Sequence, residues 1–237
     1  MDRAAPLAFV CAMPMELDPL ARKLGLEEAT VGAGVPVRAG TLGDRPVVAI
    51  VTGMGTELAT AGTTRLLDAV AVARVVVVGI TGAVDDDTPI GTLVLPEVVV
   101  NGTTGAAFRP APLGGGSPAG TMWTTDTLIT DLDEIATLRA RGVVSLDMET
   151  AAIAAVCEQR AVPWSVFRVI SDRATDGSID EEVFHLSNQD GSPNPEAVER
   201  YFAAHPKRIA AMAALAEGAL LATEKAAEAA IRACSEG

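Results

Sequence analysis

Carboxylate side chains stand at three places where the sequence pattern predicts the end of a strand. Glu16 follows the first apolar run, Glu149 follows a later run together with Asp147, and Asp172 follows the last one. Each acid alone also fits a structural role, as a partner of a helix dipole or as an N-cap. Open α/β sheets bind ligands beyond the carboxyl ends of their strands. As a group, these residues therefore indicate a site that can donate and accept protons.

The elements that must position these residues alternate between strands and helices. The valine-rich run at 74–80 is typical of a central strand that is covered on both faces. The alternation predicts an α/β fold with a mixed, mostly parallel central sheet flanked by helices and modified by one hairpin. We expect strands at 7–12, 37–42, 46–52, 74–80, 91–100, 121–125, 143–147 and 163–171, helices at 16–24, 57–72, 131–141, 149–160, 196–204 and 206–234, and irregular segments at 101–119 and 172–195.

The length of the chain favours one domain. Its 237 residues, 49% of them apolar, suit one large core, and no linker long enough to divide the chain is present. We expect a single domain over 1–237, with a core at 7–176 and a C-terminal helical extension at 194–236. The terminal helix is expected to serve packing or oligomer formation through small residues that permit close helix approach, namely Ala210, Ala211, Ala213 and Ala214.

Charge and cysteine usage exclude several classes of partner. The formal net charge of −13 opposes binding to nucleic acids and to anionic membranes. No apolar stretch reaches the ~18 residues of a membrane span. The cysteines lack CxxC spacing and lie far from both histidines, so no metal site is expected. An odd cysteine count and the absence of a leader pattern at the N-terminus favour a cytoplasmic protein.

Five segments resemble the motifs of methylthioadenosine/S-adenosylhomocysteine nucleosidases in order and approximate spacing. The most specific are Asp-Met-Glu at 147–149 and Arg-Val-Ile-Ser-Asp at 168–172, whereas the Gly-Met-Gly turn at 53–55 is weak alone. The resemblance covers residues 7–176. It implies the three-layer phosphorylase/hydrolase-like fold of the nucleoside phosphorylase superfamily, a nucleoside as the small-molecule substrate, a homodimer and no cofactor. The five segments are 12–16, 52–55, 78–83, 145–154 and 163–172.

The chemistry of that family explains why carboxylates are needed. Cleavage of an N-glycosidic bond builds oxocarbenium character on the ribose and negative charge on the departing base, which parallels inverting O-glycosidases. By the resemblance, Asp172 is the general acid that protonates purine N7, and Glu16 is the general base that activates water. Glu149 is expected to accept hydrogen bonds from the ribose 2′ and 3′ hydroxyls. A closed apolar site could raise the pKa of Asp172 enough to hold its proton.

The resemblance also assigns residues that hold the substrate. Met148 is expected to pack against the sugar, and Arg168 to orient water and carboxylates. Apart from the resemblance, the polar segment that follows offers Phe184 or His185 as a residue that could close over the substrate. The other residues expected to bind sugar or base are Asp147, Thr81, Gly82, Leu128 and Ile129. The sequence match that places Leu128 and Ile129 beside the purine is looser. The apolar start of a helix would explain these two residues equally well.

Departures from the family pattern leave alternatives open. Ile80 replaces a serine of the nucleosidases, and the segment before Thr124 is short and rich in glycine and proline, so the base and the 5′ substituent stay open. A phosphate-dependent phosphorylase is one alternative, but Val77 stands where the related phosphorylases carry an arginine, and Glu16 would repel phosphate. A non-catalytic nucleoside-binding protein is another, although it would not need an acid and a base. A dinucleotide-binding module is disfavoured, because Gly79–Gly82 lacks the required glycine spacing.

Overall fold

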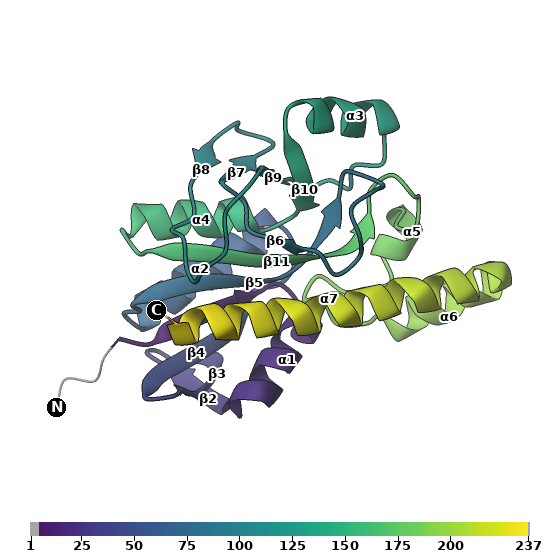
Figure 1. The fold of residues 1–237 in the computed structure, drawn as a ribbon. Helices are drawn as coiled ribbons and strands as arrows, with labels where there is room; N and C mark the ends of the chain where they lie inside the picture. Colours follow the sequence, from purple (N-terminus) through teal and green to yellow (C-terminus); the bar gives the residue numbers. More distant parts are fainter. Residues whose placement is uncertain (1–4, 237) are drawn as a thin grey trace.

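Helices cover both faces of a central sheet in the computed structural model, which describes residues 5–236 (Figure 1). The strands are β1 Leu7–Cys11, β2 Glu27–Val31, β3 Val35–Leu42, β4 Arg45–Val51, β5 Arg74–Ala83, β6 Leu93–Val94, β7 Val98–Asn101, β8 Ala107–Phe108, β9 Thr121–Thr124, β10 Val143–Asp147 and β11 Trp164–Arg173. The helices are α1 Pro14–Leu24, α2 Thr56–Ala69, α3 Leu132–Ala140, α4 Thr150–Gln159, α5 Glu181–Phe184, α6 Pro195–Ala204, the short 3-10 helix η1 Pro206–Arg208 and α7 Ile209–Glu236. The predicted α/β fold is confirmed.

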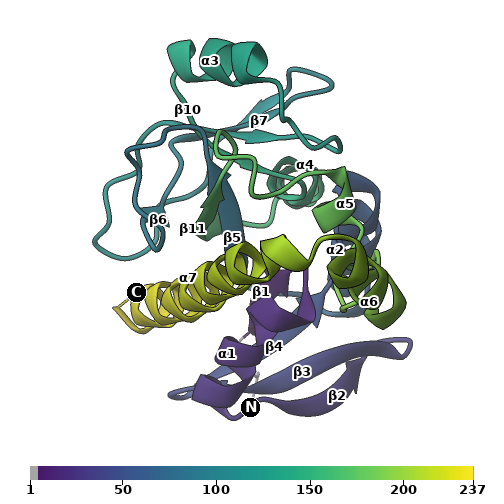
Figure 2. The ribbon, with the colours of Figure 1, turned by 90° about the vertical axis from the view of Figure 1, so that its right-hand side faces the viewer.

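The two faces of the sheet carry separate hydrophobic clusters. Along β1, Leu7 and Phe9 pack with α1 and α7, whereas Ala8 and Val10 pack with α2 and α4. The same alternation separates the valines of β5, which are all fully buried from Val75 to Val78. Figure 2 shows the two helix layers on opposite sides of β1 and β5. This double burial is why β5 is almost continuously apolar.

The sheet is mixed, with the order β2-β3-β4-β1-β5-β10-β9-β7-β8 and with β11 beside β5 and β6. Its parallel pairs are β1–β4, β1–β5, β5–β11, β9–β10 and β7–β9. Within the described residues, equally many pairs are antiparallel: β2–β3, β3–β4, β5–β10, β6–β11 and β7–β8. The expectation of a mostly parallel sheet therefore holds only for its centre. Three of the antiparallel pairs, β2–β3, β3–β4 and β7–β8, join consecutive strands through short connections, which favour antiparallel pairing, whereas β5–β10 and β6–β11 join strands far apart in the sequence.

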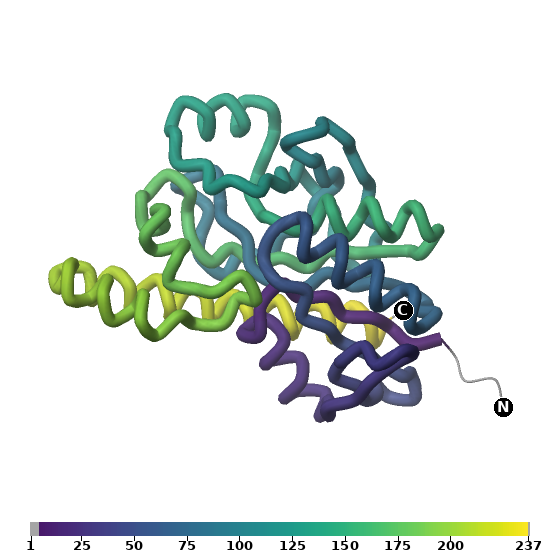
Figure 3. Tube along the Cα trace, turned by 180° about the vertical axis from the view of Figure 1, so that it is seen from behind, coloured from purple at the N-terminus to yellow at the C-terminus, as the bar shows by residue number. Residues whose placement is uncertain are grey.

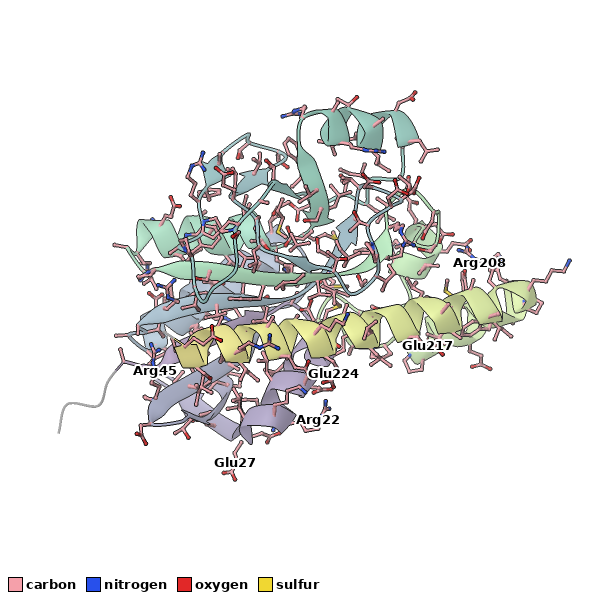
Figure 4. All side chains as sticks on the ribbon, in the orientation of Figure 1. Arg22, Glu27, Arg45, Arg208, Glu217 and Glu224 are labelled. Carbon is pink, nitrogen blue, oxygen red and sulfur yellow. The ribbon has the colours of Figure 1, made fainter. Side chains whose placement is uncertain are left out.

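Helix α7 packs along the central sheet through its C-terminal half. Ala222, Ala226 and Ala230 are completely buried against the cluster that contains β5 and β11. Small side chains let the helix axis approach the sheet closely. Lys23 of α1 binds Glu224 and Glu228 of α7, and Figure 4 shows Arg22 beside Glu224 at the same junction. The alanines expected to provide the packing surface lie in the other half of α7 and are exposed: Ala210, Ala211, Ala213 and Ala214.

Several predicted boundaries change for local reasons. Strand β2 was not expected, because its sequence Glu-Glu-Ala-Thr-Val is half exposed at the sheet edge and carries no apolar run. The strand expected at 91–100 breaks into β6 and β7 around Pro96, which has no N–H to donate. The irregular segments contain the short elements β8 and α5. None of the helices within residues 5–236 combines the length and apolarity needed to cross a bilayer.

Candidate active site

All ten residues predicted for catalysis or for binding sugar or base line one pocket, where the carboxyl ends of β1, β5, β10 and β11 come together. Glu16 enters from the first turn of α1, directly after β1, and Asp172 lies near the end of β11. Segments more than 150 residues apart in the sequence therefore share one wall. The predicted residues that line the pocket are Glu16, Thr81, Gly82, Leu128, Ile129, Asp147, Met148, Glu149, Arg168 and Asp172.

Arg168 is the centre of the charged floor of this pocket. Its side chain is buried, and its guanidinium contacts three carboxylates. Nη1 lies 3.2 Å from Glu16 Oε1, while Nη2 lies 2.9 Å from Asp147 Oδ2 and 3.1 Å from Glu149 Oε2. Burial opposes the charge of Arg168, but these three acids raise its pKa above the ordinary value. One cation thus fixes the positions of three acids from different elements.

Glu16 is held by four hydrogen bonds, although it is completely buried. Oε2 accepts from the backbone N–H groups of Ala12 at 2.7 Å and Met13 at 3.0 Å. Oε1 accepts from the N–H of Ile80 at 2.8 Å and from Arg168. Ile80 therefore contributes its backbone at the place where the nucleosidase pattern has a serine side chain. A carboxylate has about four acceptor positions, so this network satisfies Glu16 as an anion.

Gly79 leaves the space that Glu16 occupies. A Cβ atom at this position would lie 2.1 Å from Glu16 Oε1 and 2.6 Å from Arg168 Nη1. We expect Gly79→Ala to lower kcat/KM by about 10²-fold or more, because displacement of the carboxylate misplaces the reacting groups. Steady-state assays of the nucleoside cleavage that the resemblance implies measure this effect. Gly115→Ala, where a Cβ would meet nothing within 4 Å, is the control. Equal activity of the two variants would contradict the claim that Gly79 is needed to leave space for the carboxylate of Glu16.

Asp147 connects several residues of the pocket floor through its hydrogen bonds. Its Oδ1 accepts from Thr124 Oγ1 at 2.5 Å, and its Oδ2 accepts from the backbone N–H of Thr150 at 2.8 Å and from Arg168. Asp147 thus accepts the first backbone N–H of α4 and orients the arginine. Its oxygens are engaged with protein groups, so the direct substrate contact predicted for it stays a prediction. Thr81 is similar, because its hydroxyl donates to the carbonyl of Leu146 at 2.7 Å.

Glu149 faces the pocket from the N-terminus of α4. Its Oε1 accepts from the N–H of Gly55 at 2.9 Å, so the Gly-Met-Gly turn is needed to hold this acid. Burial raises the pKa of Glu149 to about 7, with the charges of Asp147 and Glu16 acting in the same direction and Arg168 opposing them. Near neutral pH the carboxyl therefore exchanges between its neutral and charged forms, and a hydroxyl-bearing ligand would favour the charged form.

The raised pKa of Glu149 predicts a pH-dependent stability. Because the folded state binds this proton more tightly than the unfolded state, the contribution of Glu149 to stability falls as the pH rises from about 4.5 to about 7. Glu149→Gln should reduce the loss of unfolding free energy between pH 5 and pH 8 by about 1–3 kcal/mol. Urea unfolding at both pH values measures it. Glu57→Gln, at an exposed site, is the control, and identical pH slopes for all three proteins would refute the assignment.

Asp172 lies at a bulge in β11. Ile170 pairs with Thr81 and Asp172 with Gly82, so Ser171 is an extra residue that redirects the following side chain. The carboxylate approaches the backbone of Gly82, where a Cβ would lie 3.0 Å from Asp172 Oδ2. Burial raises the pKa of Asp172, while the 2.5 Å hydrogen bond from Ser171 lowers it and Asp176 raises it further. This acid therefore retains a proton to higher pH than an exposed aspartate.

Some pocket residues were not predicted. Met13 and Met54 belong to recognised motifs, but nothing in the sequence indicated that their side chains line the pocket. Ile179 is a lone apolar residue in a polar segment, which is the one local signal that could have indicated it. Phe184, one of the two residues suggested to close over the substrate, lines the pocket. His185 does not line it and is exposed.

The family model described as "Phosphorylase superfamily" matches residues 6–116 and 116–204. The chain belongs to the phosphorylase superfamily. This superfamily member is 29% identical over 202 residues to a 5′-methylthioadenosine/S-adenosylhomocysteine nucleosidase of Shewanella piezotolerans, an alignment that covers 73% of this chain and 88% of that protein. The resemblance predicted from the motifs is confirmed.

Solved structures share the fold of this superfamily member. The 5′-methylthioadenosine/S-adenosylhomocysteine nucleosidase of Neisseria meningitidis, in complex with methylthio-immucillin-A, matches with a TM-score of 0.75 at 17% identity and covers 98% of this chain and 100% of that one. The native futalosine hydrolase of Helicobacter pylori matches with a TM-score of 0.74 at 16% identity, covering 99% of both chains. At these identities the structures establish the fold alone, so the substrate must be argued from the pocket.

Proposed function

We propose that this protein is a purine-nucleoside N-ribohydrolase that acts on an adenosine-type nucleoside such as 5′-methylthioadenosine. The observation that carries the proposal is a single pocket with a buried acid of raised pKa, Asp172, and a separate carboxylate, Glu16, fixed on its floor. An acid that keeps its proton and a base that is ionised are the two groups that cleavage by water requires. The names of the relatives support the same reaction class.

Each residue then has a defined part in the reaction. Asp172 protonates the departing base, which removes the negative charge that the base would otherwise carry. Glu149 accepts hydrogen bonds from the ribose hydroxyls. Its pKa is about 7 in the folded chain, so these hydrogen bonds are enough to favour its ionised form. Glu16 takes the proton of the attacking water. Arg168 and the backbone N–H groups of Ala12, Met13 and Ile80 hold Glu16 in place for this role.

The charge of the pocket favours water over phosphate as the attacking group. Four acids line it, and three of them, Glu16, Asp147 and Glu149, carry negative charge in the proposed reaction, because Asp172 keeps its proton. Among the described residues, the arginines and lysines in the lining are Arg168 and Arg173 alone, and the first is already paired with three acids. A phosphate dianion would meet net negative charge, whereas the positive charge that develops on the ribose is stabilised by it. Hydrolysis is therefore preferred to phosphorolysis.

A panel of purine nucleosides assayed for free base tests the proposal. We expect adenine release from 5′-methylthioadenosine, with far less release from pyrimidine nucleosides, because the base must be protonated by Asp172 at a purine nitrogen. The Asp172→Asn protein is the matched control for contaminating activity. If the wild-type protein releases no base from any member of the panel, the proposed activity is wrong. The homodimer and the cytoplasmic location stay predictions that this panel does not address.

A further inference from the structure

The segment Gly177–Phe184, here called the 177–184 segment, follows Asp172 closely and returns to the pocket. Its residues Ile179 and Phe184 both line the pocket. The segment contains only the four-residue helix α5, and each of its residues is at least partly exposed. So short a helix is not stable alone, and this one gains little from burial. Contacts from another part of the chain must therefore hold it in place.

Arg208 supplies three of these contacts. Its Nη1 lies 2.6 Å from Asp180 Oδ2. Its Nη2 donates to the carbonyls of Gly177 at 3.5 Å and Ser178 at 3.4 Å. A guanidinium carries several donors in one plane, so it can bind a carboxylate and two carbonyls of one turn together. Burial opposes the ionised form of Asp180, but the hydrogen bond from Arg208 lowers the pKa of this carboxyl below its ordinary value.

Asp180 connects Arg208 to the helix that ends at Phe184. Its Oδ1 accepts from the N–H of Val183 at 2.9 Å, so Asp180 is the N-cap of α5. Its carbonyl accepts from the N–H of Phe184 at 2.9 Å. A second ion pair reaches the same helix, since His205 Nε2 lies 2.8 Å from Glu182 Oε2. The position of α5 thus depends on side chains that lie after α6.

Arg208 is itself held in place by the C-terminal extension. It ends η1, directly before α7, whose C-terminal half packs on the central sheet. Its guanidinium carbon lies 5.7 Å from the centre of the Tyr201 ring, within reach of a cation–π contact, and Tyr201 of α6 is only 5% exposed. Figure 3 shows the green chain after β11 lying over the yellow-green start of α7, and in Figure 4 Arg208 lies on the side of α7 that faces α5.

We propose that Arg208 is a positioning residue that acts through Asp180 and holds the 177–184 segment over the pocket, so that Ile179 and Phe184 contact the bound nucleoside. The C-terminal extension then takes part in substrate binding and not in packing alone. Arg208 does not line the pocket, so it has no direct contact with the reacting atoms. The inference rests on the proposed function for its substrate, whereas the hold on the segment does not.

The kinetics of Arg208→Met with 5′-methylthioadenosine test the inference. Two apolar contacts that are equally strong before and during the reaction act on binding and not on chemistry. We therefore expect KM to rise by about 10-fold, while kcat stays within about 3-fold of the wild-type value. Arg208→Lys keeps the charge that faces Asp180 and should recover part of the loss. A fall in kcat with an unchanged KM would contradict a positioning role.

A double-mutant cycle shows whether Arg208 acts through Asp180. Asp180→Asn removes the charge but keeps a side chain that can cap α5. If both changes break one contact, the double variant should have the KM of Arg208→Met within about 2-fold, whereas independent effects would multiply. Arg160→Met is the matched control, because Arg160 Nη1 lies 2.6 Å from Asp68 Oδ1 and neither residue lines the pocket. An equal rise of KM in this control would overturn the inference.

Hydrogen exchange tests the hold on the segment without any assay of activity. In Arg208→Met, the peptide that contains Val183 and Phe184 should exchange about 10-fold faster or more, while peptides of β11 exchange as in the wild-type protein. Unchanged exchange of the first peptide, or faster exchange with an unaltered KM, overturns this inference alone. Absence of base release from every nucleoside overturns the proposed function, and the exchange rates then still decide whether Arg208 holds the segment.

Discussion

Asp172→Asn is expected to lower kcat by about 10²–10⁴-fold, the usual contribution of a general acid or base. Asparagine keeps the size of the side chain and can still accept the hydrogen bond from Ser171, but it has no proton to give to the departing base. Since the native carboxyl is mostly buried and its pKa is raised, the variant should be no less stable near pH 8. The loss therefore reports chemistry and not unfolding.

The pH profile sharpens this prediction. Activity requires protonated Asp172, so kcat of the wild-type protein should fall as the pH rises through the raised pKa of this carboxyl. Assays from pH 5 to pH 9 on the wild-type protein, Asp172→Asn and the exposed control Asp44→Asn measure it. The control should retain the wild-type rate and profile. If Asp172→Asn keeps more than about a tenth of the wild-type rate, Asp172 is not the acid.

Arg168→Met is expected to destabilise the protein by about 3–5 kcal/mol, the cost of removing one partner from a buried ionic cluster. Methionine preserves much of the volume, but Glu16, Asp147 and Glu149 would then be buried together without a cation. Glu149 would take up a proton to relieve the repulsion, so the destabilisation should be smaller at pH 5 than at pH 8.

Urea unfolding at both pH values measures the effect of Arg168→Met. Arg109→Met is the matched control, because Arg109 forms an exposed ion pair with Glu97. Such pairs contribute about 0–1 kcal/mol, so this variant should stay close to the wild-type protein. A loss at Arg168 no larger than the loss at Arg109 would show that the three acids do not depend on the arginine.

The sequence predicts the fold and the convergence of the acids, because both follow from local pattern. Apolar runs locate β1, β5 and β11, and the acids lie at or just after the carboxyl ends of strands, although Asp172, expected to follow the last strand, is part of β11. Strand β2 escapes prediction because an edge strand needs no apolar run. The bulge at Ser171 escapes too, since it exists only in the pairing of β11 with β5. The sequence pattern places the acids near the ends of strands. Only the pairing of β11 with β5 determines where the side chain of Asp172 points.

The position of residues 186–194 beside the pocket segments is the least predictable part of the structure. Residues 186–194 are polar and rich in turn-forming residues, which indicates a loop but not where the loop docks. Its position depends on contacts with Met13 and Met54, which come from the opposite end of the chain. Contacts between distant segments leave no periodicity in either one, so the place where this loop packs becomes visible only in three dimensions.

The sugar product formed from 5′-methylthioadenosine, with and without phosphate in the buffer, tests the central claim most directly. If water is the attacking group, adenine and the free sugar appear at the same rate in phosphate-free buffer, and added phosphate yields no sugar phosphate. This result is expected because Glu16 and its neighbours give the pocket net negative charge. Strict dependence of base release on phosphate, with a sugar 1-phosphate as the product, would contradict the assignment of Glu16 as the base that activates water.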